Sequence, residues 1–212
     1  MRSAFHVTDQ QFREIANVRD LKDGTTATVL LIEEGTLIHA NVGDGEGFLH
    51  WKDGRIVPVT KAHKVSDRDE VARIEELERK KKTRVLLNLG PAGGMAVSDP
   101  DGNYMRVSRS IGDRMYDPEI VTCDPHLGQI ALSPDADFVV IASDGIWDFL
   151  SFENVADMVK GLSGTSQVKA AEILVDEAIR KGSQDNCTAV VVFLASGRPT
   201  SISLSRTSER DK

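Results

Sequence analysis

The chain has 212 residues, of which 40% are hydrophobic and 28% charged, and its formal net charge is −7. That length allows one substantial core, and the composition is that of an ordinary soluble globular protein, so we expect a single domain. The excess of acids argues against binding the phosphate backbone of nucleic acid. No apolar run is long enough to span a bilayer, no signal-peptide pattern is visible, and two cysteines are too few for a disulfide framework. We therefore expect a protein of the cytoplasm or nucleus that does not bind membranes.

The first half of the chain predicts a short lead-in followed by antiparallel strands. Residues 1–24 are mixed and polar, with a short helix expected over 10–18. Branched residues, interrupted by Glu34-Gly35 and later turns, then predict a hairpin that continues as a meander. The expected strands are 26–33, 36–42, 48–51 and 56–59.

After this meander the hydrophobic period changes from two to about 3.6. Val71, Ile74 and Leu77 are spaced by three, and Ser66 or Asp67 precedes them as a capping residue. This pattern predicts a helix over 67–82. The following stretch, 90–104, is rich in glycine, proline and short polar residues, and we expect it to be a loop.

The second half of the chain centres on an apolar run that ends in an acid. Residues 138–142 predict a strand covered on both faces, and Asp144-Gly145 follows. We expect Gly145 to adopt a backbone conformation closed to other residues, so that the chain turns away while Asp144 stays at the end of the sheet. Trp147 is expected to be buried core without a catalytic role.

The remaining elements follow from capping residues and periodicity. Ser151 and Gly182 mark a helix start and a helix end, and the apolar run before Ser196 predicts a last buried strand. The tail, 196–212, is poor in apolar residues and is expected to be disordered. The predicted elements are helices over 151–160 and 167–181 and strands over 127–132 and 187–194.

Three acids occupy similar places beside strand ends. Asp44 follows one predicted strand, Asp144 follows another, and Asp185 precedes the last one, each near a glycine or small residue. Hard divalent ions prefer oxygen ligands and keep several waters, and strand ends are rigid places from which to present carboxylates. On chemistry alone, a shared metal site and three unrelated loop acids remain equally good explanations.

The residues around these acids carry a resemblance to a known family. Five blocks occur in the order typical of the metal-dependent protein serine/threonine phosphatases of the protein phosphatase 2C (PP2C) family, and the resemblance covers roughly residues 24–194. They are Gly24-Thr25-Thr26-Ala27, Ala40-Asn41-Val42-Gly43-Asp44, Ser108-Arg109-Ser110-Ile111-Gly112-Asp113, Ala142-Ser143-Asp144-Gly145-Ile146-Trp147-Asp148 and Gly182-Ser183-Gln184-Asp185-Asn186. The resemblance implies an α+β fold, a sandwich of two antiparallel sheets flanked by helices, over residues 1–195.

The resemblance also implies roles for the acids. Asp144 and Asp185 match the acids that bind a pair of Mn²⁺ or Mg²⁺ ions, and Asp44 matches an acid often assigned to a third, weaker ion. In the family these ions activate a water that attacks the phosphorus of phosphoserine or phosphothreonine. The implied partner is a phosphorylated protein, and we expect a monomer.

The chain also departs from the family pattern. The Asp-Gly-His-Gly-Gly block, which supplies the bridging acid and a proposed general-acid histidine, is absent from the sequence, as is the phosphate-holding arginine. No catalytic residue can therefore be assigned, and we expect a domain that lacks its N-terminal part and is weakly active or inactive. One alternative is a catalytically dead pseudophosphatase that acts as a binding or regulatory module. Another is a non-viable fragment whose exposed sheet edges make it aggregate.

Overall fold

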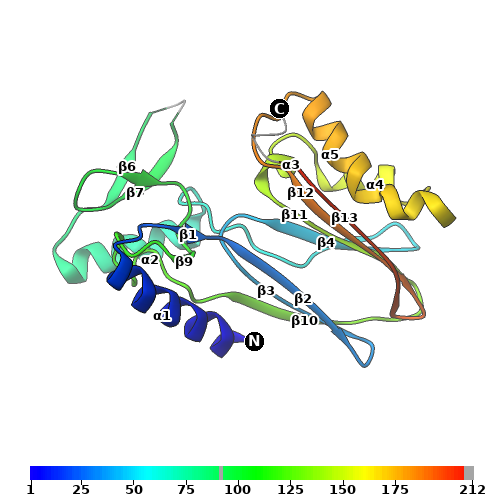
Figure 1. The fold of residues 1–212 in the computed structure, drawn as a ribbon, viewed down its shortest axis with the longest axis horizontal. Coiled ribbons are helices and arrows are strands. Elements are labelled where there is room, and N and C mark those ends of the chain that lie inside the picture. The colour runs from blue at the N-terminus through cyan, green and yellow to red at the C-terminus, as the bar shows by residue number, and fades with distance from the viewer. Residues whose placement is uncertain (91–92, 208–212) are drawn as a thin grey trace. The chain divides into compact units, whose positions relative to one another are not determined.

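The computed structural model describes residues 1–90 and 93–207 (Figure 1). The length predicts one domain, but the described chain divides into two compact units that alternate along the sequence. The first unit holds 1–28, 40–44 and 62–127, and the second holds 29–39, 45–61 and 128–212. Each unit has its own apolar clusters.

The second unit is built on a five-stranded sheet. Its strands, in spatial order, are β13 (Arg198–Arg206), β12 (Thr188–Ala195), β11 (Ala136–Ala142), β4 (Glu46–Trp51) and β5 (Ile56–Pro58). All neighbouring pairs are antiparallel. The short helix α3 (Asp144–Trp147) follows β11, and α4 (Phe152–Val159), the 3₁₀ helix η1 (Gly164–Lys169) and α5 (Ala170–Arg180) follow in turn.

Both faces of this sheet are covered. Figure 1 shows α4 and α5 along one face, where Phe138, Val140 and Leu174 belong to the larger apolar cluster. The other face packs on a three-stranded sheet of order β10 (His126–Ala131), β3 (Thr36–Val42) and β2 (Ala27–Glu33). Leu37 and Val139 are fully buried in the cluster between the two sheets. Residues 138–142 of β11 are all apolar because both faces of the strand are covered, as the sequence predicts.

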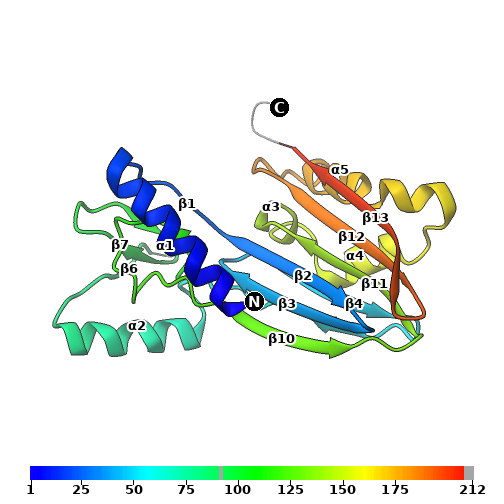
Figure 2. The same cartoon turned by 60° about the horizontal axis from the view of Figure 1, so that its bottom comes forward.

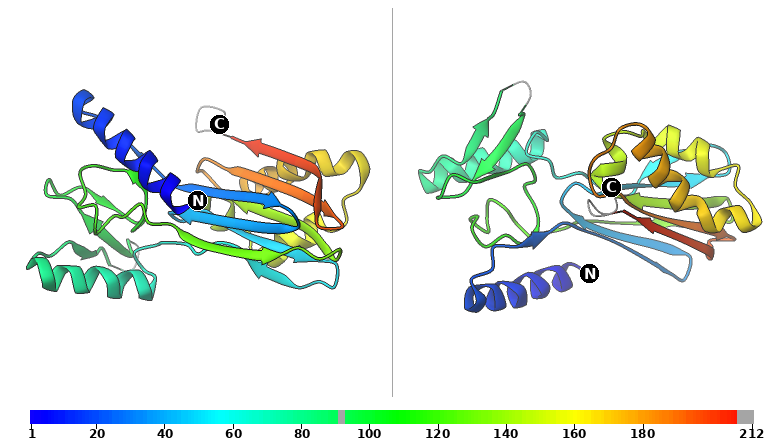
Figure 3. Two further views of the ribbon diagram at one scale, coloured as in Figure 1. Left: turned by 90° about the horizontal axis from the view of Figure 1, so that it is seen from below. Right: turned by 45° about the horizontal axis from the view of Figure 1, so that its top comes forward.

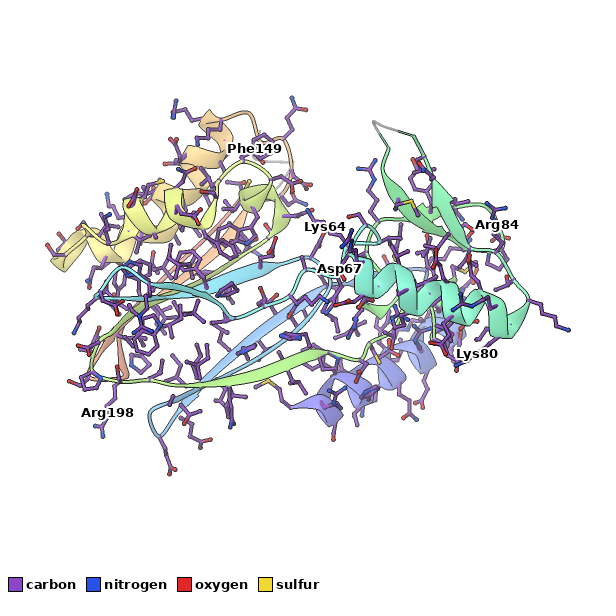
Figure 4. The ribbon with its side chains drawn as sticks, turned by 180° about the vertical axis from the view of Figure 1, so that it is seen from behind. Lys64, Asp67, Lys80, Arg84, Phe149 and Arg198 are labelled. Carbon is purple, nitrogen blue, oxygen red and sulfur yellow. The ribbon has the colours of Figure 1, made fainter. Side chains whose placement is uncertain are left out.

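The first unit contains two helices and two small sheets. Its helices are α1 (Arg2–Arg19) and α2 (Arg68–Lys81). One sheet pairs β1 (Gly24–Thr25) with β9 (Ile111–Gly112), and the other has the order β6 (Leu86–Asn88), β7 (Met95–Ser98) and β8 (Tyr104–Met105). Helix α2 begins after Asp67, whose side chain accepts hydrogen bonds from the amides of Asp69 and Glu70, as a capping acid should. Figure 4 labels Asp67 and Lys80 near the two ends of this helix.

The structure confirms most predicted elements. The hairpin of β2 and β3, the helix after Asp67, the strand β11 and the strand β12 all form at the predicted places. Helix α4 begins with a capping box at Ser151, also as predicted. The expected α+β fold of antiparallel sheets with flanking helices is likewise confirmed.

Four predictions about local structure are wrong. The expected lead-in is instead the 18-residue helix α1. The expected loop over 90–104 contains strand β7 and the first residue of β8. Residues 91–92 of that stretch lie outside the described chain. The meander is also wrong, because β4 pairs with β11 and β5 in a different sheet from β3. The predicted disorder of the tail is wrong over 198–206, because these residues form β13, which pairs with β12. The rest of the predicted tail, 208–212, lies outside the described residues.

Candidate metal centre

Asp144 lies where the central strand of the second unit ends. Strand β11 finishes at Ala142, and Asp144 is the first residue of α3. Its side chain is half-buried, and its Oδ1 accepts a hydrogen bond from the amide of Gly145 at 2.9 Å. One carboxylate oxygen is thus oriented by the backbone of its own short helix.

Asp185 lies on a loop that is hydrogen-bonded to the loop of Asp144. Ser143, just before the first acid, donates its Oγ–H to the carbonyl of Asn186 at 3.1 Å. The amide of Thr188 donates to the same Oγ at 3.0 Å, and Ser183 Oγ donates to the carbonyl of Gly145 at 2.8 Å. Asp185 itself is exposed, and its Oδ1 accepts from the amide of Asn186 at 2.6 Å. The structure therefore brings the backbone segments that carry the two acids into direct contact.

Gly145 has a different role from the expected one. It lies in α3 and is not among the glycines with positive φ, so the backbone freedom of glycine is not used here. Instead, a Cβ at this position would lie 2.5 Å from the carbonyl oxygen of Asn186. Glycine is required because the two acid-bearing segments pass too close together for any side chain.

Gly145→Ala should therefore lower the free energy of unfolding by about 1 to 3 kcal/mol, since the new methyl group must push the two loops apart. The matched control is Gly161→Ala, where nothing lies within 4 Å of the added Cβ. Urea denaturation of both variants measures the difference. If the two variants were equally stable, the contact between the segments of Asp144 and Asp185 would not be as close as described.

Trp147 supports the same end of the sheet. Its indole N–H donates to the carbonyls of Glu46 and Ala142, both at 2.9 Å, and its ring contacts Phe48 and Phe152 edge-on. The side chain is partly buried against the larger apolar cluster. The expected core role is supported by these contacts, although the burial is incomplete.

Asp44 belongs to the first unit, where it follows β3 and is half-buried. The turn before it is tightly held. Gly43 has a φ of +90°, and a Cβ there would lie 2.2 Å from Thr26 Cγ2. Its carbonyl accepts hydrogen bonds from the backbone amide of His63 at 2.9 Å and from the Nδ1 of the same residue at 3.0 Å. Asp44 therefore starts from a rigid turn, as a ligand should.

A buried ion network forms the centre of the first unit, and the sequence did not predict its arrangement. Glu70 is 1% exposed, and its carboxylate accepts from Arg109 Nε at 3.0 Å, from Arg73 Nη2 at 2.9 Å and from Ser108 Oγ at 2.7 Å. Burial alone would raise the pKa of Glu70, but the hydrogen bonds from Arg109 and Ser108 and the two positive charges outweigh it and lower the pKa to about 2. The available signal was that Glu70 lies four residues before Ile74, on the apolar stripe of its helix.

The acids do not form a crowded cluster of metal ligands in the described residues. Within 1–90 and 93–207, no three His, Cys, Asp or Glu side chains gather into a group that could enclose a metal. Mg²⁺ commonly binds through one or two carboxylates and keeps several waters. Also, no helix in the described part of the chain is both long and apolar enough to cross a membrane.

Comparisons with a family model and with known sequences point to the same family. The family model described as protein phosphatase 2C matches residues 1–187. The probable protein phosphatase 2C 69 of Arabidopsis thaliana is 32% identical over 209 residues, which cover 98% of this chain and 54% of that protein. The probable protein phosphatase 2C 69 of Oryza sativa subsp. japonica is 35% identical over 192 residues, covering 90% of this chain and 43% of that protein. The chain thus spans about half the length of these curated relatives.

Solved structures show the same fold. The structure of a C. elegans sex determining protein superposes with a TM-score of 0.78 at 24% identity, covering 92% of this chain and 46% of that one. The crystal structure of serine-threonine phosphatase 2C from Toxoplasma gondii gives a TM-score of 0.77 at 17% identity, covering 89% of this chain and 64% of that one.

Proposed function

Because this chain belongs to the protein phosphatase 2C family, we propose that it serves the dephosphorylation of phosphoserine or phosphothreonine in proteins and that Asp144 and Asp185 hold Mn²⁺ or Mg²⁺. The observation that carries the metal proposal is the hydrogen-bonded contact between the segments of these two acids. Asp44, on its own rigid turn, is proposed to hold a further and weaker ion. The cytoplasm or nucleus remains the expected location.

At such a site the protein would position the carboxylates. The Gly145 amide holds one carboxylate oxygen of Asp144, and the Asn186 amide holds one of Asp185, so each acid is oriented by the backbone of its own segment. When bound, a pair of divalent ions lowers the pKa of a water and stabilises the attacking and leaving oxygens of phosphoryl transfer. The carboxylates also remain partly open to water, which a hydrated ion needs.

We propose that this chain alone has little turnover. The sequence contains no Asp-Gly-His-Gly segment, so the acid that would bridge two ions has no counterpart here. A site with few carboxylates binds divalent ions weakly. Without the ions, the attacking water has neither a lowered pKa nor a fixed position for attack. The alternative, a pseudophosphatase that binds partners without turnover, is favoured by the same missing segment.

The test is a titration of residues 1–212 with Mn²⁺, followed through the electron paramagnetic resonance signal of the free ion. We expect weak binding that is lost in Asp144→Asn and in Asp185→Asn. Asp176→Asn, which removes an exposed acid from α5, is the control and should bind like the unaltered chain. Equal binding by all four proteins would refute the site.

The same proteins should be assayed for hydrolysis of p-nitrophenyl phosphate and of a phosphothreonine peptide. We expect turnover well below the rate of about 1 per second at the lower end of typical enzymes. Turnover above that rate, lost in Asp144→Asn, would show that the missing segment is dispensable. Mn²⁺ binding with no hydrolysis at all would favour the pseudophosphatase.

A further inference from the structure

A cavity of about 680 Å³ lies at the end of the five-stranded sheet that is farther from Asp144. Asp144 follows Ala142, which pairs with Glu46 at the start of β4, whereas the cavity is lined by His50 near the end of β4. Its other walls come from the turn between β4 and β5 and from α4. In Figures 2 and 3, α4 and α5 lie along one side of this sheet, coloured yellow and orange. The cavity therefore belongs to the second unit alone.

His50 brings a buried ring nitrogen to this cavity. The residue is only 5% exposed, and its ring stacks on Phe138 with the two centroids 4.5 Å apart. Its Nδ1 lies 3.1 Å from Oδ2 of Asp137. Because an ionised carboxylate can only accept, Nδ1 carries the proton of the neutral ring and Nε2 is an acceptor. No described residue donates to this Nε2, so a buried acceptor at the cavity wall is without a donor.

The charges around His50 favour a cation as the missing donor. Lys52 Nζ is already engaged with the carbonyl of Pro134 at 2.9 Å, and Lys160 Nζ pairs with Asp157 at 2.5 Å. Glu153, in the first turn of α4, has no ion-pair partner in the described part of the chain. Acids outnumber lysines by four to two in the lining, the charged members being Asp53, Asp137, Glu153, Asp157, Lys52 and Lys160. The wall therefore offers more acceptors than donors.

A guanidinium group matches these acceptors best. A bare metal ion is a poorer match, because within 1–90 and 93–207 no three His, Cys, Asp or Glu side chains could hold one. A guanidinium carries five N–H donors in a planar fork, is always charged and is more weakly hydrated than an ammonium. The acceptors lie at increasing exposure, with His50 buried, Asp137 29% exposed at its side chain and Glu153 on the surface. A group with donors on several sides can therefore reach the buried nitrogen and still contact the outer acids.

We propose that this cavity binds a guanidinium group, with Nε2 of His50 and the carboxylates of Asp137 and Glu153 as its acceptors. The group comes either from a small guanidine compound or from an arginine side chain of a partner protein. The volume of the cavity is in the range of small-ligand sites. The proposal does not rest on the phosphatase function, because the acceptors lie at the other end of the sheet from Asp144.

The test follows the imidazole resonances of the full chain, labelled with ¹⁵N-histidine, at about pH 8, where an ordinary histidine is neutral. The probes are butylguanidine, the peptide acetyl-Gly-Arg-Gly-amide and, as the neutral control, butanol. We expect both guanidinium probes to shift the Nε2 resonance of His50, with dissociation constants of about 1 mM or below. Butanol should leave it in place. Tighter binding of the peptide would assign the site to a partner's arginine, and tighter binding of butylguanidine would assign it to a small molecule.

Two variants of exposed acids separate this site from general attraction to an acidic protein. Glu153→Gln should weaken binding of the guanidinium probes about threefold or more, because one charged acceptor is lost. Glu172→Gln removes an exposed acid of α5 that does not line the cavity, and it should bind like the unaltered chain. His50→Gln identifies the resonances of His50 among those of the five histidines.

Four results would overturn the proposal. The first is a neutral ring of His50 that carries its proton on Nε2 in the free chain. The second is a shift with butanol as large as that with the guanidinium probes. The third is equal binding by the two glutamate variants. The last is the absence of any shift at about ten times the expected dissociation constant.

Discussion

Glu70→Gln should lower the free energy of unfolding by about 3 to 5 kcal/mol, the range found when one partner of a buried ion pair is removed. The variant keeps the shape of the side chain but leaves Arg109 and Arg73 without their shared carboxylate. Arg109 is 18% exposed and Arg73 is 26% exposed, so water can replace only part of the lost interaction. Ser108, which is fully buried, loses the charged acceptor of one hydrogen bond and keeps the carbonyl of His63 as the other.

Urea denaturation followed by circular dichroism measures this effect. The control is Glu76→Gln on the same helix, where the carboxylate pairs with Lys80 in solvent and its removal should leave the midpoint unchanged. A loss in Glu70→Gln no greater than that of the control would show that the network contributes no net stability. The comparison is matched because both changes remove one acid from α2.

The stability of the protein should fall by about 3 kcal/mol between neutral pH and pH 4 through His63 alone. Burial is the largest cause that lowers the pKa of His63, and the nearby Arg109 lowers it further, to about 4. The unfolded chain takes up a proton near pH 6.5, whereas the folded chain does so only near pH 4. The contribution is therefore fully present above pH 6.5, and it is lost as the pH falls through this window.

His63→Asn should remove this pH dependence, because an asparagine can still donate to the carbonyl of Gly43 but does not titrate. The free energies of unfolding of both proteins, measured from about pH 7 to about pH 4, give the two slopes. Glu70 contributes its own loss only below its unfolded pKa of 4.5, because its folded-state pKa is about 2, so the slopes above about pH 5 report on His63. Parallel slopes in the two proteins would mean that His63 is accessible to protons in the folded state.

Helices and strands could be predicted wherever a hydrophobic periodicity or a helix-capping residue determines them. The spacing of Val71, Ile74 and Leu77 indicated the helix after Asp67, and the unbroken apolar run indicated β11. Strand pairing over long distances could not be predicted in this way. The pairing of β4 with β11 joins Phe48 to Val140, and no local pattern contains both. Length could not reveal the division into two units for the same reason.

Strand β13 was missed although a signal was present. Ile202 and Leu204 alternate with serines, which is the period of two expected for a strand. The low apolar content of the tail outweighed that alternation in the prediction. Pairing with β12 determines the conformation of this segment, because eight of its residues have register partners in β12. Composition carries no information about such pairing.

The sequence named the candidate acids but not the hydrogen bonds that hold their segments. Asp144 and Asp185 were identified from their places beside strands, and the structure adds the hydrogen bonds of Ser143 and Ser183 that join their segments. Hydroxyl groups of this kind have no distinctive spacing in a sequence. The ion network of Glu70 was hidden for another reason, since only the fold brings Arg109 to it across 39 residues.

The indole of Trp147 has a consequence for the thermodynamics of ion capture. Its N–H joins the carbonyls of Glu46 and Ala142, two residues that are register partners at the end of β4 and β11. Asp144 stands in the same short helical turn as this indole. If Asp144 holds an ion as proposed, part of the conformational entropy that its carboxylate would lose on meeting the cation is already lost when the chain folds. Loosening the aromatic anchor should weaken ion affinity without changing a single ligand atom.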